Sequence, residues 1–163
     1  MMSANAWEVL NGTDLFNDEQ VRNNRNTELY QYNCFGYATN TYQWLLPYDT
    51  EEEDEMYFSP YFKELDNDEC AERTAANMLE GFQGRMRRIS SLDELKEDEY
   101  GILYKCSDGD FHFVKYFPDS KQFWHKPGAT RIRRMARAIA LGDVWYSTYE
   151  RYDSKTIFFA MKK

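Results

Sequence analysis

The sequence predicts a single α+β domain in which N-terminal helices pack on an antiparallel β-sheet. Segments with helical spacing of apolar residues come first, and short alternating segments separated by tight-turn signals follow. Neither an internal repeat nor an interdomain linker divides the 163 residues. This order of elements favours a layered arrangement, with the helices covering one face of the sheet.

The chain begins with a polar arm, residues 1–31, which is rich in Asn, Asp and Glu. Asn33 is then a suitable N-cap for a helix that starts at Cys34, continues to about Leu46 and ends before Pro47. The buried face of this helix is expected to hold four residues at helical spacing: Phe35, Ala38, Tyr42 and Leu45.

The acidic run Glu51–Glu55 predicts a solvated loop, because a calcium site of this length needs its ligands arranged around a turn glycine. A second helix follows. Its start is indicated by the acidic and amide groups of Asp66–Asp68, and Gly81 or Gly84 ends it.

The pattern then changes to strands. The first is expected at Tyr100–Cys106, the second in the segment "FHFVKYF" after the turn "SDGD", and the third in "QFWHKPG" after the turn "PDSK". Alternation in the second strand places Phe111, Phe113 and Lys115 on one face, and His112, Val114 and Tyr116 on the other.

The remainder of the chain opens with the basic segment "RIRRMARAIALGD", which is expected to be helical or a loop. One or two strands in "VWYSTYERYDSKTIFFAMKK" complete the sheet. Aromatic residues make up 17% of the chain and are expected mostly in the core, in particular Trp44, Tyr57, Phe58, Tyr61, Trp124 and Trp145.

Composition narrows the classes of function. The formal charge of −8 argues against a main role in binding nucleic-acid phosphates, which requires clustered Lys and Arg. No apolar run reaches the ~18 residues of a membrane helix, and the N-terminus has no secretory-signal pattern. We therefore expect action in the cytoplasm of the producing cell, although delivery by a specialised machine would leave no mark in the sequence.

Three widely spaced cysteines do not form a disulfide framework, and two histidines without a paired-cysteine motif do not form a structural zinc site. Cys70 and Cys106 are expected to be core thiols. No metal or organic cofactor is implied.

Cys34 is the candidate nucleophile. A thiol attacks as the thiolate, which a helix start and a neighbouring imidazole both favour. The two histidines of the chain, His112 and His125, lie on adjacent predicted strands, where the second can hold the ring of the first. Asn33, Gly36 and Trp124 are candidate substrate-binding residues: Gly36 would let a substrate approach closely, and Trp124 would form a wall beside His125.

The residues also resemble a known family. A helix-borne Cys, a His on a strand and a polar residue on the next strand occur in this order in papain-like NlpC/P60 thiol hydrolases. The segment "NCFGYA" is similar to their Asp-Cys-Ser-Gly helix, with Asn33 and Phe35 in place of Asp and Ser, and the resemblance extends to about Gly128.

This resemblance implies a papain-like fold and a cysteine peptidase or amidase. Cys34 would be the nucleophile, His112 the base and His125 the orienting residue. The substrate would be an amide of a peptide or protein: a peptide, isopeptide or glutamine side-chain bond. The family's cell-wall substrate is not carried over, because the chain has no secretory signal and no wall-binding repeat.

Other interpretations stay open. Cys34 and the histidines can be packed core residues of a non-catalytic binding or inhibitor module on the same fold. Asp110 or Asn33, rather than His125, can orient the His112 ring. A nucleic-acid site would require the arginines of the basic segment, Arg131, Arg133, Arg134 and Arg137, to share one exposed face.

Overall fold

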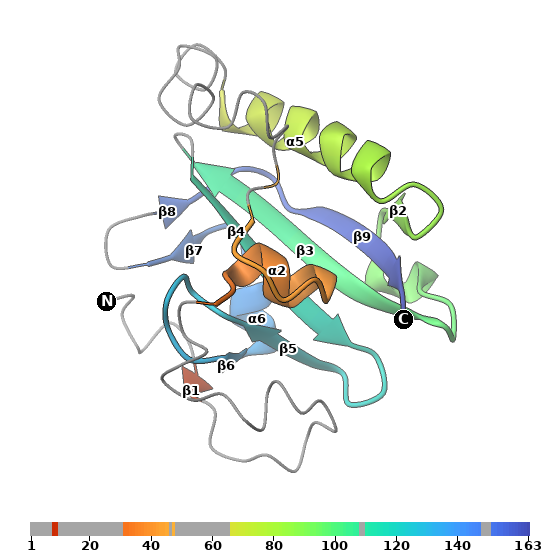
Figure 1. The fold of residues 1–163 in the computed structure, drawn as a ribbon. Helices are drawn as coiled ribbons and strands as arrows, with labels where there is room; N and C mark the ends of the chain where they lie inside the picture. Colours follow the sequence, from red (N-terminus) through yellow and green to blue (C-terminus); the bar gives the residue numbers. More distant parts are fainter. Residues whose placement is uncertain (1–7, 10–30, 46, 48–65, 108–109, 148–150) are drawn as a thin grey trace.

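The computed structural model describes residues 8–9, 31–45, 47, 66–107, 110–147 and 151–163 (Figure 1). Most of the predicted N-terminal arm therefore lies outside the described residues. So do the acidic run Glu51–Glu55 and the aromatic residues Tyr57, Phe58 and Tyr61.

Within the described residues, seven strands form one antiparallel sheet in the order β1-β6-β5-β4-β3-β9-β2. Their bounds are β1 Glu8–Val9, β2 Met86–Ile89, β3 Glu99–Ser107, β4 Asp110–Phe117, β5 Gln122–His125, β6 Arg133–Met135 and β9 Ile157–Lys162. A separate pair consists of β7 Trp145–Tyr146 and β8 Arg151–Tyr152. The long strands β3 and β4 lie at the centre and carry most of the core.

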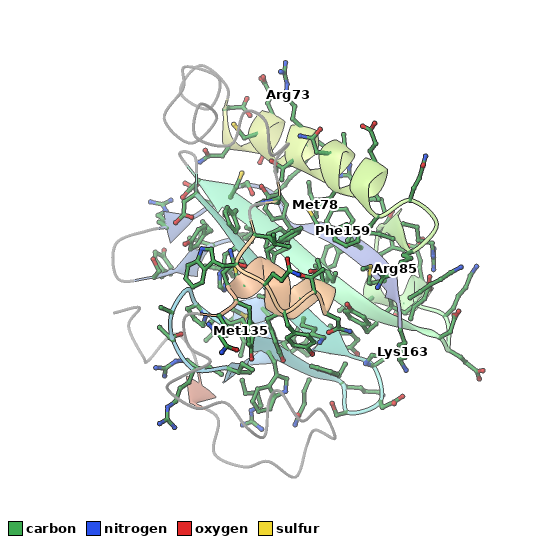
Figure 2. All side chains as sticks on the ribbon, in the orientation of Figure 1. Arg73, Met78, Arg85, Met135, Phe159 and Lys163 are labelled. Atoms are coloured by element: carbon green, nitrogen blue, oxygen red, sulfur yellow. The ribbon has the colours of Figure 1, made fainter. Side chains whose placement is uncertain are left out.

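Helices cover both faces of this sheet (Figure 1). The helices are α2 Cys34–Thr39, α5 Asn67–Gly81, α6 Arg137–Ala140 and the 3₁₀ turn η2 Leu92–Glu94. The first face carries α2 and α5, and on it Met78 of α5 lies beside Phe159 of β9 (Figure 2). The second face is covered by α6 and the β7–β8 pair.

The central strands confirm the predicted alternation. Phe111 and Phe113 belong to the core cluster under α2 and α5. Val114 and Tyr116 belong to the cluster on the second face, with Trp145. The α+β arrangement, with its N-terminal helices on an antiparallel sheet, is therefore confirmed.

The second helix also starts where its sequence predicts. The side chain of Asp66 accepts a hydrogen bond from the Glu69 N–H at 2.8 Å, and the helix ends at Gly81. The carboxylates of Asp68 and Glu69 in its first turn add favourable charge at the positive end of the helix.

The first helix is shorter than predicted, because it ends at Thr39 rather than near Leu46. Asn40 and Tyr42 have φ values of 60° and 51°, which break the helix and reverse the chain. The Tyr42 N–H then donates to the Gly36 carbonyl at 3.0 Å, so the chain folds back over the helix.

Three further expectations were wrong. The basic segment holds an expected helix, α6, but the strand β6 precedes it, and α6 lies on the second face rather than with the other helices. The C-terminal segment holds three strands rather than one or two. Trp44 is 48% exposed and is not a core residue, whereas Trp145 is fully buried as expected.

Candidate functional site

The start of α2 is fixed by the side chain of Asn33. Its Oδ1 accepts the Gly36 N–H at 3.0 Å, which confirms the predicted N-cap, and its Nδ2 donates to the Leu45 carbonyl at 2.6 Å. The amide thus joins the first turn of the helix to the returning chain. Cys34, the first residue of the helix, is held in place with its side chain 4% exposed.

The Cys34 sulfur lies against the main chain of β4. The backbone N–H groups of Phe113 and Phe35 both donate to it. Because the N–H of a strand residue points within the plane of the sheet, a sulfur bound to Phe113 lies beside β4 and not simply above the α2 face. Phe113 directly follows His112 in β4, so the thiol contacts the main chain one residue away from the candidate base.

The two histidines meet, as their places on adjacent strands predict. His112 Nε2 and His125 Nδ1 are 2.8 Å apart, within hydrogen-bond distance, and the two rings are nearly perpendicular. Nε2 of His112 faces His125, so we expect any proton from Cys34 to go to the other ring nitrogen, Nδ1. The catalytic roles of the three residues stay predictions.

The His112 ring projects to the second face of the sheet. Its centroid lies 5.5 Å from that of Tyr152 and 5.9 Å from that of Trp145, and both of these rings belong to the second core cluster. Cys34 belongs to the first cluster. The site therefore lies at the level of the sheet, where β4 separates the two clusters.

The neighbours of Cys34 connect it to both histidines. Burial is the main cause of the raised pKa of Tyr152, and negative charge on Asp110 and then on Cys34 raises it further; the Tyr152 ring packs on His112. Burial raises the pKa of Cys34, and the positive charge of Lys126, the residue after His125, opposes a small part of that rise. Within the described residues, β4 pairs with β5 from Lys115 to Phe117. The earlier part of β4, which carries His112, is therefore not paired with β5.

Burial keeps the thiol and the imidazoles neutral. It raises the pKa of Cys34 to about 12, against the opposing effect of the Phe113 N–H, and the negative charge of Asp110 raises it further. Burial lowers the pKa of His112 to about 3. The pKa of His125 is well below its usual value because of burial and then the positive charges of His112 and Arg133.

The predicted substrate-binding residues have other contacts. The Asn33 side chain is used in capping. At Gly36, an added Cβ would lie 2.0 Å from the Gln43 carbonyl oxygen, so the close approach there is made by the chain itself and not by a substrate. Trp124 is 1% exposed and packs in a core cluster with Tyr32 and Tyr37, so it does not form the wall of an open groove.

Sequence reasoning missed two residues beside the site. Tyr152 donates from its hydroxyl to Asp110 Oδ2 at 2.9 Å, and it lies so far along the chain that no spacing signals it. The signal for Lys126 was its position directly after His125, at the end of the predicted strand. Asp110 had been an alternative orienting residue for His112, and here it accepts from Tyr152.

Cys70 and Cys106 are buried, as expected, and burial raises the pKa of Cys106 to about 12. Arg133 and Arg134 are consecutive residues of β6 and so point to opposite faces, which disfavours one shared basic surface.

The described part of the chain has no group of three or more His, Cys, Asp or Glu side chains placed to hold a metal ion. Within the same residues, no helix combines the length and apolar character needed to cross a bilayer.

Comparison of the chain with protein-family models, with curated proteins and with solved structures found no match.

Proposed function

We propose that this protein is a papain-like thiol hydrolase of the NlpC/P60 type, which cleaves an amide bond of a peptide or protein. One observation supports this most strongly: the Cys34 sulfur accepts the N–H of the residue after His112, and Nε2 of His112 is held 2.8 Å from His125. The candidate nucleophile, base and orienting group therefore lie near one another along β4, as a thiol hydrolase requires.

The reaction begins with proton transfer from the Cys34 thiol to Nδ1 of His112. The thiolate attacks the amide carbonyl carbon, and His112 returns the proton to the leaving amine. A thioester to Cys34 remains, and a water molecule then releases the acid and restores the thiol. His125 lies within hydrogen-bond distance of Nε2 of His112 and holds the ring, so that Nδ1 takes and returns the proton in this mechanism.

Burial decides how such a site works. Each charge alone is unfavourable here, as the pKa of about 12 for Cys34 and about 3 for His112 show. Transfer of the proton within the pair creates both charges together, and their attraction offsets part of the cost of burying them. The site should therefore hold a neutral pair before substrate binds.

The same burial favours a second candidate function, a non-catalytic binding module. Cys34, His112 and His125 are at most 4% exposed, as core residues are. Trp44 and Tyr146 are large apolar residues about half exposed, which offer contact area to a partner protein. In this reading the three residues only stabilise the fold.

Acylation by an activated ester separates these two functions. The folded protein is incubated with p-nitrophenyl acetate at pH 7.5, and the acetyl group is located by peptide mass spectrometry. We expect one acetyl group on Cys34, none on Cys70 or Cys106, and at least a tenfold slower reaction in His112→Gln. Cys70→Ala, which removes another buried thiol, should react as the wild type does.

If Cys34 acquires no acetyl group while the protein remains folded, or if His112→Gln reacts as fast as the wild type, the hydrolase proposal fails. The binding module is then the better description, and capture of a partner becomes the next experiment.

A further inference from the structure

Lys126 is a buried lysine at the end of β5, next to His125. Its side chain is inaccessible to solvent, and its Nζ donates to the carbonyl oxygens of Tyr32 at 2.5 Å and Gly128 at 2.7 Å. The ammonium also lies over the Tyr32 and Trp44 rings, 4.9 and 5.8 Å from their centroids. Burying an ammonium is costly, so its position calls for a physical reason.

The contacts of Lys126 lead to Cys34. Tyr32 immediately precedes Asn33, the residue that caps α2. The bond from Lys126 to the Tyr32 carbonyl therefore joins the end of β5 to the segment that enters the helix. Gly128, with a φ of 53°, turns the chain so that its carbonyl faces back to the same ammonium. Carbonyl oxygens carry only partial charges, so these two hydrogen bonds do not neutralise the Lys126 ammonium.

We propose that Lys126 is a positioning residue for Cys34: it fixes the entry to α2 and supplies the positive charge that stabilises negative charge on the Cys34 sulfur. This inference deepens the proposed hydrolase function and rests on it for its role in catalysis. Its electrostatic part concerns the thiol alone and can be measured without a substrate.

Among the described residues, two charged groups act on the Cys34 thiol. Asp110, at the start of β4, disfavours a negative charge on the sulfur, and Lys126 favours it. The Tyr152 hydroxyl of β8 donates a hydrogen bond to Asp110, and the two histidines are neutral. Burial lowers the pKa of Lys126 to about 8, although the negative charge of Cys34 raises it. The support for a thiolate is thus present below about pH 8 and is lost above it.

Lys105 provides a matched control. It is also buried, at 1% exposed, and its Nζ donates to two carbonyl oxygens, those of Asp143 at 2.8 Å and Ser154 at 2.7 Å. It also lies over a ring, 5.6 Å from the centroid of Trp145. The thiol whose charge acts on Lys105 is Cys106, and Lys105 is not among the charges that act on Cys34. Replacing Lys105 therefore removes the same kind of contacts without changing the charge on Cys34.

The test is the rate of alkylation by iodoacetamide from pH 6 to 10, followed for each cysteine by mass spectrometry. In the wild type, the logarithm of the Cys34 rate should rise with pH and flatten near pH 8, where Lys126 loses its proton. Lys126→Met should lower the Cys34 rate at pH 7 by about tenfold. Lys126→Arg, which keeps the charge at all these pH values, should restore most of the rate and remove the break.

Lys105→Met should leave the Cys34 profile unchanged. The inference is overturned if the wild-type profile rises through pH 8 without a break, a result that needs no variant to fold. It is also overturned if folded Lys126→Met and Lys105→Met change the Cys34 rate equally. If Cys34 shows the break but is never acetylated by the ester, the electrostatic role of Lys126 holds and the hydrolase proposal fails.

Discussion

Lowering the pH from 7.5 to 5.5 should destabilise the fold through His112 and His125. These are the two histidines of the chain, and no other side-chain type ordinarily titrates in this range. Both are buried, and burial holds the pKa of His112 at about 3 and that of His125 well below its usual value. The unfolded chain therefore takes up protons in this range that the folded protein does not.

The magnitude follows from the pKa of about 6.5 that a histidine has in an unfolded chain. At pH 5.5, each histidine that stays neutral in the fold lowers the free energy of unfolding by about 1.4 kcal/mol. Together, His112 and His125 should cost about 3 kcal/mol. The sign is fixed: this stability is present above pH 6.5 and is lost as the pH falls from there toward 3.

Urea unfolding, followed by tryptophan fluorescence at pH 7.5, 6.5 and 5.5, measures this loss. With a slope of about 2 kcal/mol per molar urea, the midpoint should fall by about 1.4 M between the two extremes. His112→Gln and His125→Gln each keep one buried histidine, so each should show about half of this pH dependence. Because the comparison is made within each variant, a uniform loss of stability from the substitution does not affect it.

A midpoint that stays constant between pH 7.5 and 5.5 would refute the burial of two neutral imidazoles in the native state. A midpoint that rises on acidification would mean that the folded protein binds the proton more tightly than the unfolded chain. Either result would also remove the neutral Cys34–His112 pair from the proposed mechanism.

Two further substitutions test a close main-chain contact and a partly buried ion pair. Gly36→Ala should lower the free energy of unfolding in urea by about 3 kcal/mol, because the added Cβ would overlap the Gln43 main chain. The control Gly81→Ala has open space around its Cβ and should be neutral or slightly stabilising. Glu99→Gln should cost about 2 kcal/mol at pH 7, because it replaces the carboxylate that accepts two hydrogen bonds from Arg87. The Arg87 guanidinium holds the pKa of Glu99 at about 2, so this difference should shrink as the pH falls from about 4.5 toward 2, and a constant difference would contradict the pairing.

The sequence was most informative where a local pattern repeats. The alternation in "FHFVKYF" predicted which residues of β4 share a face, and the two core clusters confirm it. Asn33 and Asp66 predicted two helix starts, because a cap is formed by residues only three apart in the chain. The adjacency of β4 and β5 was also local, since a short turn joins them, and it brought His112 and His125 together.

Other features depended on contacts between distant segments. The return of the chain over Gly36 shortened the first helix, and nothing in the helical spacing after Thr39 indicates that return. The short strand β6 was missed because three residues are too few for alternation to be recognised. The burial of Trp124 and the exposure of Trp44 likewise depend on which segments fold against them.

The sequence by itself determined the α+β arrangement and which residues of the central strands share a face. It also identified the candidate thiol, Cys34, and the two histidines that were expected to meet. Only the tertiary structure decided the electrostatic character of the site. It placed Cys34 beside the β4 main chain, packed Tyr152 on His112 and directed Lys126 to the entry of α2. The physical reason is that patterns in sequence report contacts between near neighbours, whereas burial and charge at one atom are sums over groups from every part of the chain.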